Sequence, residues 1–406
     1  MVHDAELILV AGALLGVGVA ASLLAARLRL PALVLFLGLG MLIGSDGLGW
    51  IDFDNYRLAR LIGTIALVLI LFDGGLAAGW GEIRPVLRSA LRLAVAGTVV
   101  TALIAGLAAS WIFDFSLLEG LLLGAILAAT DGAAVFALLR GARLPARLSR
   151  TLEAEAGFND PVAVLLVLVV IELIVNPHYD VGDIVVFLVQ EVGVGVAIGV
   201  GVGWLAIAAT RRARLPTGLA LVGSLATAAT SYGAAGALGG SGFLAVYLTG
   251  LALGSAPLRD RPAVLAFHEG LASVAEIGMF LALGLLVFPS QLGDVALKGI
   301  LLALITALVA RPFAVALTTW NIGLNRRERA LLGWAGLRGA VPVVLATFPV
   351  IARVPHSLEF FNIVFFAVLL STLLQGSTFE PLARRLGATE PTRPTAARSP
   401  GSAPSR

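Results

Sequence analysis

Residues 151–175 read TLEAEAGFNDPVAVLLVLVVIELIV, an apolar run that nevertheless contains acids and a proline. A bilayer core about 30 Å thick needs about 20 apolar residues per helix, and this run is long enough to cross it. A charge at the bilayer centre costs about 2.5–3.5 kcal/mol on insertion scales. The stretch therefore predicts a membrane helix in which Glu155 and Asp160 are retained for a functional or structural reason.

The composition of the whole chain agrees with this prediction. Of 406 residues, 59% are apolar and 13% are charged, whereas a soluble domain carries about 25% charged residues. These values exclude a soluble globular enzyme and a disordered chain. The apolar runs are continuous, which favours helices over the alternating strands of a membrane barrel. Cysteine is absent, so disulfides and thiolate sites are excluded. We predict an all-α, polytopic membrane protein.

At about 20 apolar residues per crossing, the sequence contains thirteen expected spans, and the charges of the loops support this count. The expected spans are residues 6–26, 31–44, 58–79, 89–113, 117–139, 151–175, 184–209, 216–235, 241–256, 263–288, 298–320, 330–350 and 358–380. Arginines gather in every second loop: Arg27 and Arg29; Arg84 and Arg88; Arg140, Arg143, Arg147 and Arg150; Arg211, Arg212 and Arg214; Arg259 and Arg261; Arg326, Arg327 and Arg329; Arg384 and Arg385. The positive-inside rule then places the N-terminus outside and the C-terminus in the cytoplasm.

Several charged residues fall within the expected spans. They lie in LILFDGGL, LAATDGAAVF, LEAEAGFNDPVAV, LVARPFAV and WAGLRGAVPVV and include Asp73, Asp131, Glu155, Asp160, Arg311 and Arg338. Glycines and a proline interrupt the spans beside Asp131 and Arg338. Broken helices expose free N–H and C=O groups that act as partial charges. An acid suits the N-terminal ends and a base the C-terminal ends, so the two interruptions are predicted to be counterparts in an inverted-repeat transporter.

The most specific functional prediction concerns Asp160. A carboxylate in a polar cavity at the midplane can hold either a proton or a cation, and Pro161 loosens the helix beside it. Glu155 precedes Asp160 by five residues and therefore lies on another face of the helix, about 140° away. It needs a separate partner, for which Arg311 is the candidate. Asp73 is expected either to line the cytoplasmic funnel or to solvate a helix end.

These motifs, in this order, resemble the monovalent cation:proton antiporters of the NhaP and sodium/proton exchanger superfamily, with the closest resemblance to bacterial potassium/proton antiporters of the CvrA type. The resemblance extends to about residue 386. It implies thirteen spans with two discontinuous, crossing helices, a core at about 85–175 and 298–386, and a dimerisation part at about 1–84 and 184–290. The protein would be a homodimer in the bacterial inner membrane, surrounded by lipid, and would act in pH homeostasis.

The resemblance also implies residue roles. Asp160 would carry the ion and the proton beside Asn159, Thr130 and Asp131 would belong to the first crossover, and Arg338 would compensate the second. Glu155 and Arg311 would be the buried ion pair. The substrates would be K⁺ or Na⁺ and H⁺, exchanged in a 1:1 electroneutral cycle by alternating access, without a cofactor, a further metal or nucleic acid. Ala156 and Asp73 stand where many sodium-transporting relatives have Ser and Glu.

Two other classes compete with the antiporter. A cation channel or uncoupled conductance would need a continuous pore with a filter, and an intramembrane hydrolase would need a recognisable two-aspartate or zinc motif; neither motif is present in the sequence. Residues 387–406 are predicted to form a disordered cytoplasmic tail. The four histidines, including His268 and His356, are expected at the surface near span ends, with His268 able to sense pH.

Overall fold

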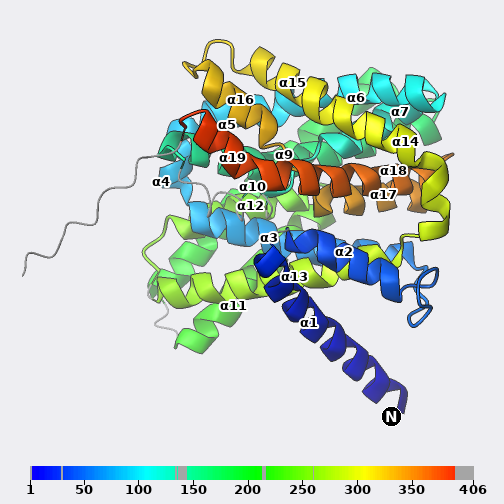
Figure 1. Cartoon of the computed structure of the whole chain (residues 1–406). Helices are drawn as coiled ribbons and strands as arrows, with labels where there is room; N and C mark the ends of the chain where they lie inside the picture. Colours follow the sequence, from blue (N-terminus) through cyan, green and yellow to red (C-terminus); the bar gives the residue numbers. More distant parts are fainter. Residues whose placement is uncertain are drawn as a thin grey trace, which may run out of the picture.

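The computed structural model describes residues 2–28, 31–132, 135, 144–212, 216–258 and 260–388, and within these ranges the chain is helical without a β-strand (Figure 1). The expected tail beyond residue 388 and several loop arginines lie outside the described residues: Arg29, Arg140, Arg143, Arg214 and Arg259. The α-helices are α1 (Val2–Leu28), α2 (Ala32–Ile43), α3 (Tyr56–Ala78), α4 (Trp80–Ile83), α5 (Leu87–Arg92), α6 (Thr98–Phe113), α7 (Leu117–Ala128), α9 (Ala146–Val175), α10 (Val181–Arg212), α11 (Thr217–Ala237), α12 (Gly242–Gly254), α13 (Arg261–Leu285), α14 (Pro289–Ile305), α15 (Arg311–Thr318), α16 (Arg326–Trp334), α17 (Ala340–Ile351), α18 (Ser357–Leu370) and α19 (Gly376–Arg385).

Lengths and compositions match a membrane protein. In the described part of the chain, eight helices are long and apolar enough to cross a bilayer, and α2, α7, α12 and α17 are shorter apolar helices. Every expected span overlaps a helix. Two spans differ from continuous helices. Helix α7 ends at Ala128, and the expected span at 330–350 is divided into α16 and α17.

Three helices continue through π-helical turns, which the sequence did not predict. These turns lie at Leu93–Gly97, Thr306–Ala310 and Ser371–Gln375 and join α5 to α6, α14 to α15 and α18 to α19. A π-turn inserts one residue into the helical repeat and is frequent near functional sites.

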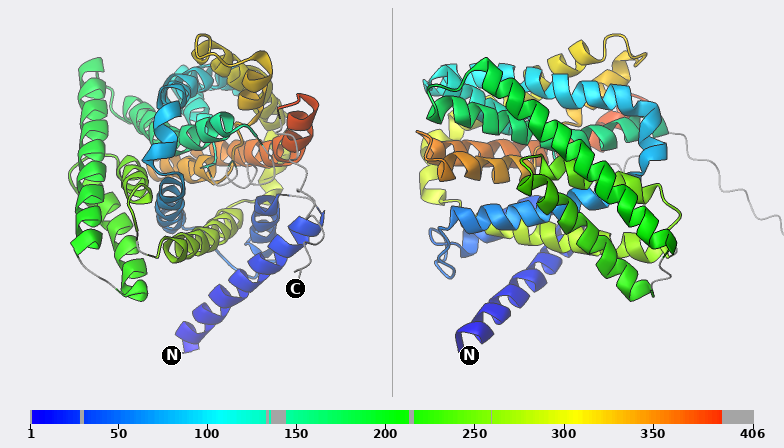
Figure 2. Two further views of the ribbon diagram at one scale, coloured as in Figure 1. Left: turned by 90° about the vertical axis from the view of Figure 1, so that its left-hand side faces the viewer. Right: turned by 180° about the vertical axis from the view of Figure 1, so that it is seen from behind.

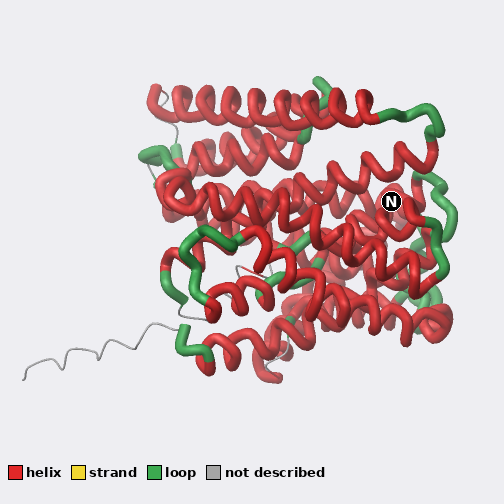
Figure 3. Tube along the Cα trace, turned by 90° about the horizontal axis from the view of Figure 1, so that it is seen from above, coloured by secondary structure: helices red, strands yellow, loops and turns green. Residues whose placement is uncertain are grey.

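The helices run side by side through most of the molecule (Figures 2 and 3). Helices α10, α11 and α12 pack against one another at one side, and α12 continues this packing to α3. Glycines allow close approach, as small residues do between membrane helices. A Cβ on Gly75 of α3 would lie 2.6 Å from the Tyr247 carbonyl of α12, and Gly250 of α12 meets the Phe72 carbonyl at the same distance. Helix α1 projects away from the rest of the chain (Figure 1).

The outer surface is apolar where lipid is expected. Along α10, Val185, Val189, Val196 and Val200 are all exposed, and few residues of its most apolar window are buried inside the chain. Such a surface is unfavourable in water and favourable against lipid tails.

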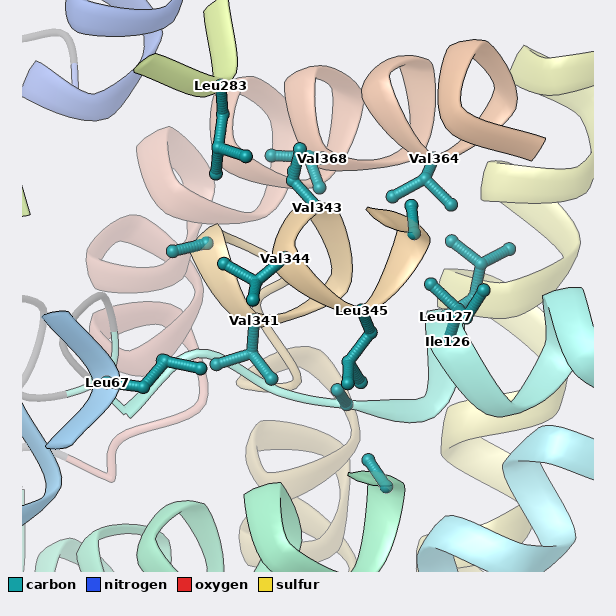
Figure 4. Close-up of a cluster of buried hydrophobic side chains, with 14 of the residues drawn as sticks. Leu67, Ile126, Leu127, Leu283, Val341, Val343, Val344, Leu345, Val364 and Val368 are labelled. Atoms are coloured by element: carbon teal, nitrogen blue, oxygen red, sulfur yellow. The ribbon is translucent and has the colours of Figure 1, made fainter. Parts of the chain in front are cut away.

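Helix α17 lies at the centre of the main hydrophobic cluster (Figure 4). Its Val341, Val343, Val344 and Leu345 are at most 1% exposed. Around them lie side chains from α3, α7, α13 and α18, among them Leu67, Ile126, Leu127, Leu283, Val364 and Val368. A half-length helix held on all sides fixes the direction in which its N-terminus points.

The prediction that His268 lies at the surface was wrong. His268 of α13 is 1% exposed, its Nε2 lies 2.8 Å from Ser224 Oγ of α11, and its ring packs against Phe72 at a centroid distance of 4.8 Å. The residue lies two turns inside its helix, where the packing of α3 and α11 covers it.

Candidate functional site

The end of α7 is joined directly to the segment before α17. After Ala128 the backbone becomes extended, with φ −60° and ψ 138° at Ala129. The Asp131 N–H then donates to the Leu337 carbonyl at 2.8 Å. Two interruptions that are more than 200 residues apart in the sequence therefore meet in space.

Two charged side chains lie at these helix ends. Asp131 Oδ2 accepts a hydrogen bond of 2.9 Å from the Ala340 N–H, the first residue of α17. Arg338 Nε donates to the Leu127 carbonyl at 2.7 Å, in the last turn of α7. The acid thus faces a helix N-terminus and the base a helix C-terminus, which is the favourable pairing with the helix dipoles. Each charge compensates the helix from the other half of the chain.

Gly339 is required by this arrangement. A Cβ built on Gly339 overlaps the Asp131 carboxylate. Any side chain at this position would push the carboxylate away from the Ala340 N–H, so the close approach depends on glycine.

The π-turn at Ser371–Gln375 holds the backbone of Arg338. Ser371 Oγ accepts from the Arg338 N–H at 2.9 Å, and Thr372 Oγ1 donates to the Arg338 carbonyl at 3.1 Å. Gln375 Nε2 donates to the Trp334 carbonyl at 3.0 Å. These residues were missed by the sequence reasoning. Their signal was a polar STLLQ stretch in an otherwise apolar span.

Asp160 lies next to the interruption after α7. Its neighbour Asn159 accepts from the Thr130 N–H at 3.1 Å through Oδ1 and donates from Nδ2 to Thr98 Oγ1 at 2.8 Å. Asn159 therefore fixes α9 against the extended segment and the start of α6. The role of Thr98 was also missed.

One oxygen of the Asp160 carboxylate is buried without a hydrogen-bond partner among the described residues. The residue is 3% exposed, and none of the described residues donates a hydrogen bond to Oδ1. Pro161 has no N–H, so the Gly157 carbonyl lacks its helical donor in the same turn. Because a buried carboxylate oxygen is costly without a partner, the arrangement indicates a site for a proton or a cation.

Glu155 and Arg311 form a separate ion pair. Arg311 Nη2 lies 2.5 Å from Glu155 Oε1, and both side chains are 2% exposed. The same Nη2 donates to the Leu332 carbonyl at 3.4 Å. The pair joins α9 to α15 and, through Leu332, to α16. Because both charges are buried, the pair is a structural tie between helices that are far apart in the sequence.

Asp73 lies in α3 and differs from the other acids in being partly exposed.

Among the described residues, no group of three or more His, Asp or Glu side chains is arranged to hold a metal ion.

A cavity of about 660 Å³ lies at the ends of α3, α9 and α12. Its walls include Ala77, Glu82, Arg150, Glu153 and Ser255. Glu82 and Arg150, both in its wall, form an ion pair. The cavity is polar on its α9 side, where Ser149 Oγ donates to Glu153 Oε1 at 3.0 Å.

Comparisons with known proteins agree on one family. Residues 11–385 match the transmembrane domain of the sodium/hydrogen exchangers. The K⁺/H⁺ antiporter NhaP2 of Shewanella sp. (strain ANA-3) is 42% identical over 387 residues, which cover 94% of this chain and 67% of that protein. The K⁺/H⁺ antiporter NhaP of Alkalimonas amylolytica is 42% identical, with 93% and 66% covered.

A solved structure shows the same architecture. The sodium/proton antiporter MjNhaP1 of Methanocaldococcus jannaschii, determined at pH 8, superposes with a TM-score of 0.83 at 25% identity. The match covers 93% of this chain and 98% of that one.

Proposed function

The chain belongs to the sodium/hydrogen exchanger family, and we propose that it exchanges K⁺ for H⁺ at the Asp160 carboxylate. It is a multi-pass membrane protein and a monovalent cation/proton antiporter. The observation that carries the assignment of Asp160 is its buried Oδ1, which receives no hydrogen bond from the described residues. One carboxylate that binds either a proton or a cation couples the two fluxes by competition.

The surrounding residues prepare this carboxylate. Asn159 positions α9 against Thr130, and Asp131 together with Arg338 neutralises the interrupted helix ends. Thr130 has its N–H engaged by Asn159 while its position beside the break suits an oxygen ligand to the cation. Asp73, partly exposed on α3, would line the approach to the site.

The choice of K⁺ over Na⁺ rests on the relatives. Those named K⁺/H⁺ antiporters are 41–42% identical, while the Na⁺/H⁺ antiporter of Aphanothece halophytica is 29% identical. Ala156 beside Glu155 offers no hydroxyl ligand.

The overall organisation proposed for the chain follows the same family. Thirteen spans form inverted repeats, with crossing interruptions after α7 and before α17. The core at about 85–175 and 298–386 moves against a dimerisation part at about 1–84 and 184–290. The arginine-rich loops face the cytoplasm of a bacterium, and two copies form a homodimer in the inner membrane.

Alternating access distinguishes this function from a channel. Asp160 is sealed from solvent in this structure, whereas a conducting pore would expose it to both sides. Two charges never occupy the carboxylate together, so one K⁺ crosses for each H⁺ and no net charge moves.

Asp160→Asn in proteoliposomes tests the assignment. The amide keeps the shape of the side chain but cannot exchange a proton. We expect the K⁺-driven pH change to be lost. The size-exclusion elution profile and the melting temperature should be unchanged, because the variant stays folded. The control is Glu172→Gln, an exposed carboxylate near the other end of the same helix, which should retain coupled exchange. Wild-type activity in Asp160→Asn would overturn the assignment.

A further inference from the structure

The cavity at the ends of α3, α9 and α12 stops short of Asp160. Its wall on α9 reaches Glu153, which is half-buried, while Asp160 is 3% exposed and does not line it. An ion that enters the cavity must therefore pass a closed segment before it reaches the carboxylate.

That segment lies on a single face of α9. Glu153 and Asp160 are seven residues apart, which is about 20° short of two full turns and about 10 Å along the axis. Gly157 lies between them on nearly the same face. Because it has no side chain, the helix has a notch between the two acids.

Tyr247 of α12 fills this notch. A Cβ built on Gly157 overlaps the Tyr247 ring, so the ring lies directly on the glycine backbone. Phe158 supports the ring from the side, with centroids 5.0 Å apart in an edge-to-face arrangement. Since Gly157 lies between Glu153 and Asp160 in the sequence of α9, the ring is placed between the two acids along the helix axis.

The hydroxyl is unusual for a buried tyrosine. Tyr247 is 1% exposed, and none of the described residues makes a hydrogen bond to its oxygen. Buried hydroxyl groups nearly always have a partner. Here the oxygen lies against Gly157, between Glu153 and Asp160 along α9, and offers an unused acceptor to a cation or its water.

We propose that Tyr247 is the inner seal of the transport site: its ring closes the notch at Gly157 between the cavity and Asp160, and its hydroxyl binds the cation as it passes from Glu153 to Asp160. The proposal rests on the proposed function in taking Asp160 as the carrier. Tyr247 belongs to α12 and Gly157 to α9, so the seal opens when α9 moves against α12.

Cysteine accessibility tests the seal without any need for transport, because the native chain has no cysteine. Asp160→Cys is reacted with a membrane-impermeant methanethiosulfonate from the side on which Ser149→Cys, in the cavity wall, reacts. We expect Asp160→Cys to react at least tenfold more slowly than Ser149→Cys. Adding Tyr247→Ala should raise its rate at least tenfold, and adding Tyr247→Phe should leave it slow.

Two further variants keep this test interpretable. Gly157→Ala retains the tyrosine but forces the ring out of the notch, so it should also accelerate the reaction of Asp160→Cys. Tyr232→Ala removes a tyrosine from α11, where it packs on Phe243, and should change nothing. The seal is disproved if Asp160→Cys reacts equally fast with and without the Tyr247 ring, or stays slow after its removal.

Transport kinetics test the hydroxyl. These variants are made in the chain that keeps its native Asp160. Tyr247→Phe should raise the KM for K⁺ about fivefold with kcat unchanged, and Tyr232→Phe should alter neither constant. An unchanged KM in Tyr247→Phe would remove the hydroxyl from the proposal. If Asp160 proves not to be the carrier, transport will survive Asp160→Asn, while the labelling rates still report whether Tyr247 closes the path.

Discussion

Breaking the ion pair between Glu155 and Arg311 should destabilise the protein strongly. We consider three variants: Glu155→Gln, Arg311→Gln and the double substitution. Each single variant leaves one charge at a position that is 2% exposed and was paired at 2.5 Å. Removing one partner of a buried pair costs about 3–5 kcal/mol. The double variant leaves two neutral amides that can bond to each other and should recover part of this loss.

The size of this loss of stability depends more on the burial of the two charges than on their mutual attraction. Glu82 and Arg150 offer a matched control, because they form an ion pair with side chains 56% and 33% exposed. Solvent screens such a pair, which contributes about 0–1 kcal/mol. The same cycle of Gln substitutions at Glu82 and Arg150 should therefore give a small loss and little coupling.

The assay is a titration of purified protein with sodium dodecyl sulfate in mixed micelles, followed by circular dichroism and tryptophan fluorescence. The coupling energy is the sum of the single-variant losses minus the double-variant loss, so that a positive value means that the two residues stabilise each other. We expect a coupling of at least about 2 kcal/mol at the buried pair. Additive losses would refute the pairing and make Arg338 the next partner to test for Glu155.

Three further outcomes are expected. An imposed membrane potential, set by a permeant-anion gradient, should not drive pH change in proteoliposomes, since one K⁺ and one H⁺ exchange at one carboxylate; transport driven by voltage alone would show that a second group titrates, with Asp131 the first to examine. Gly339→Ala should abolish most transport because its Cβ displaces the Asp131 carboxylate, whereas Gly278→Ala, which has open space around it, should transport normally; equal activity in both would contradict the crossover geometry. The Ser290 N–H donates to Asp46 and holds the pKa of that carboxyl below its usual value, so the hydrogen bond stabilises the fold at neutral pH and this stabilisation is lost as the pH falls through the lowered pKa. Asp46→Asn should therefore melt at a lower temperature than wild type at pH 7 and at the same temperature at low pH. A difference in melting temperature that grows towards acid pH would contradict the argument.

Much of the arrangement could be predicted because charge is expensive in a bilayer. Asp131, Asp160 and Arg338 stand out in apolar surroundings, and each must be compensated by something. The glycines beside them indicated interruptions, and the structure has α7 end at Ala128 and α17 begin at Ala340. Local composition was sufficient for these features.

The remaining features depend on contacts between distant segments. Thr98 and Ser371 are ordinary residues in apolar spans, and they matter because π-turns aim them at Asn159 and Arg338. Tyr247 contacts α9 only after the helices have packed. His268 was misplaced for the same reason, since position near a span end does not reveal which helix will cover a side chain.

The number of protons released when K⁺ binds tests the central claim most directly. Purified protein is titrated with K⁺ by calorimetry in buffers that differ in ionisation enthalpy, near the pH of half-maximal transport. If one carboxylate binds both ions in turn, saturation with K⁺ should release up to one proton per chain, and Asp160→Asn should bind no K⁺ and release none. Undiminished proton release from Asp160→Asn would contradict the account.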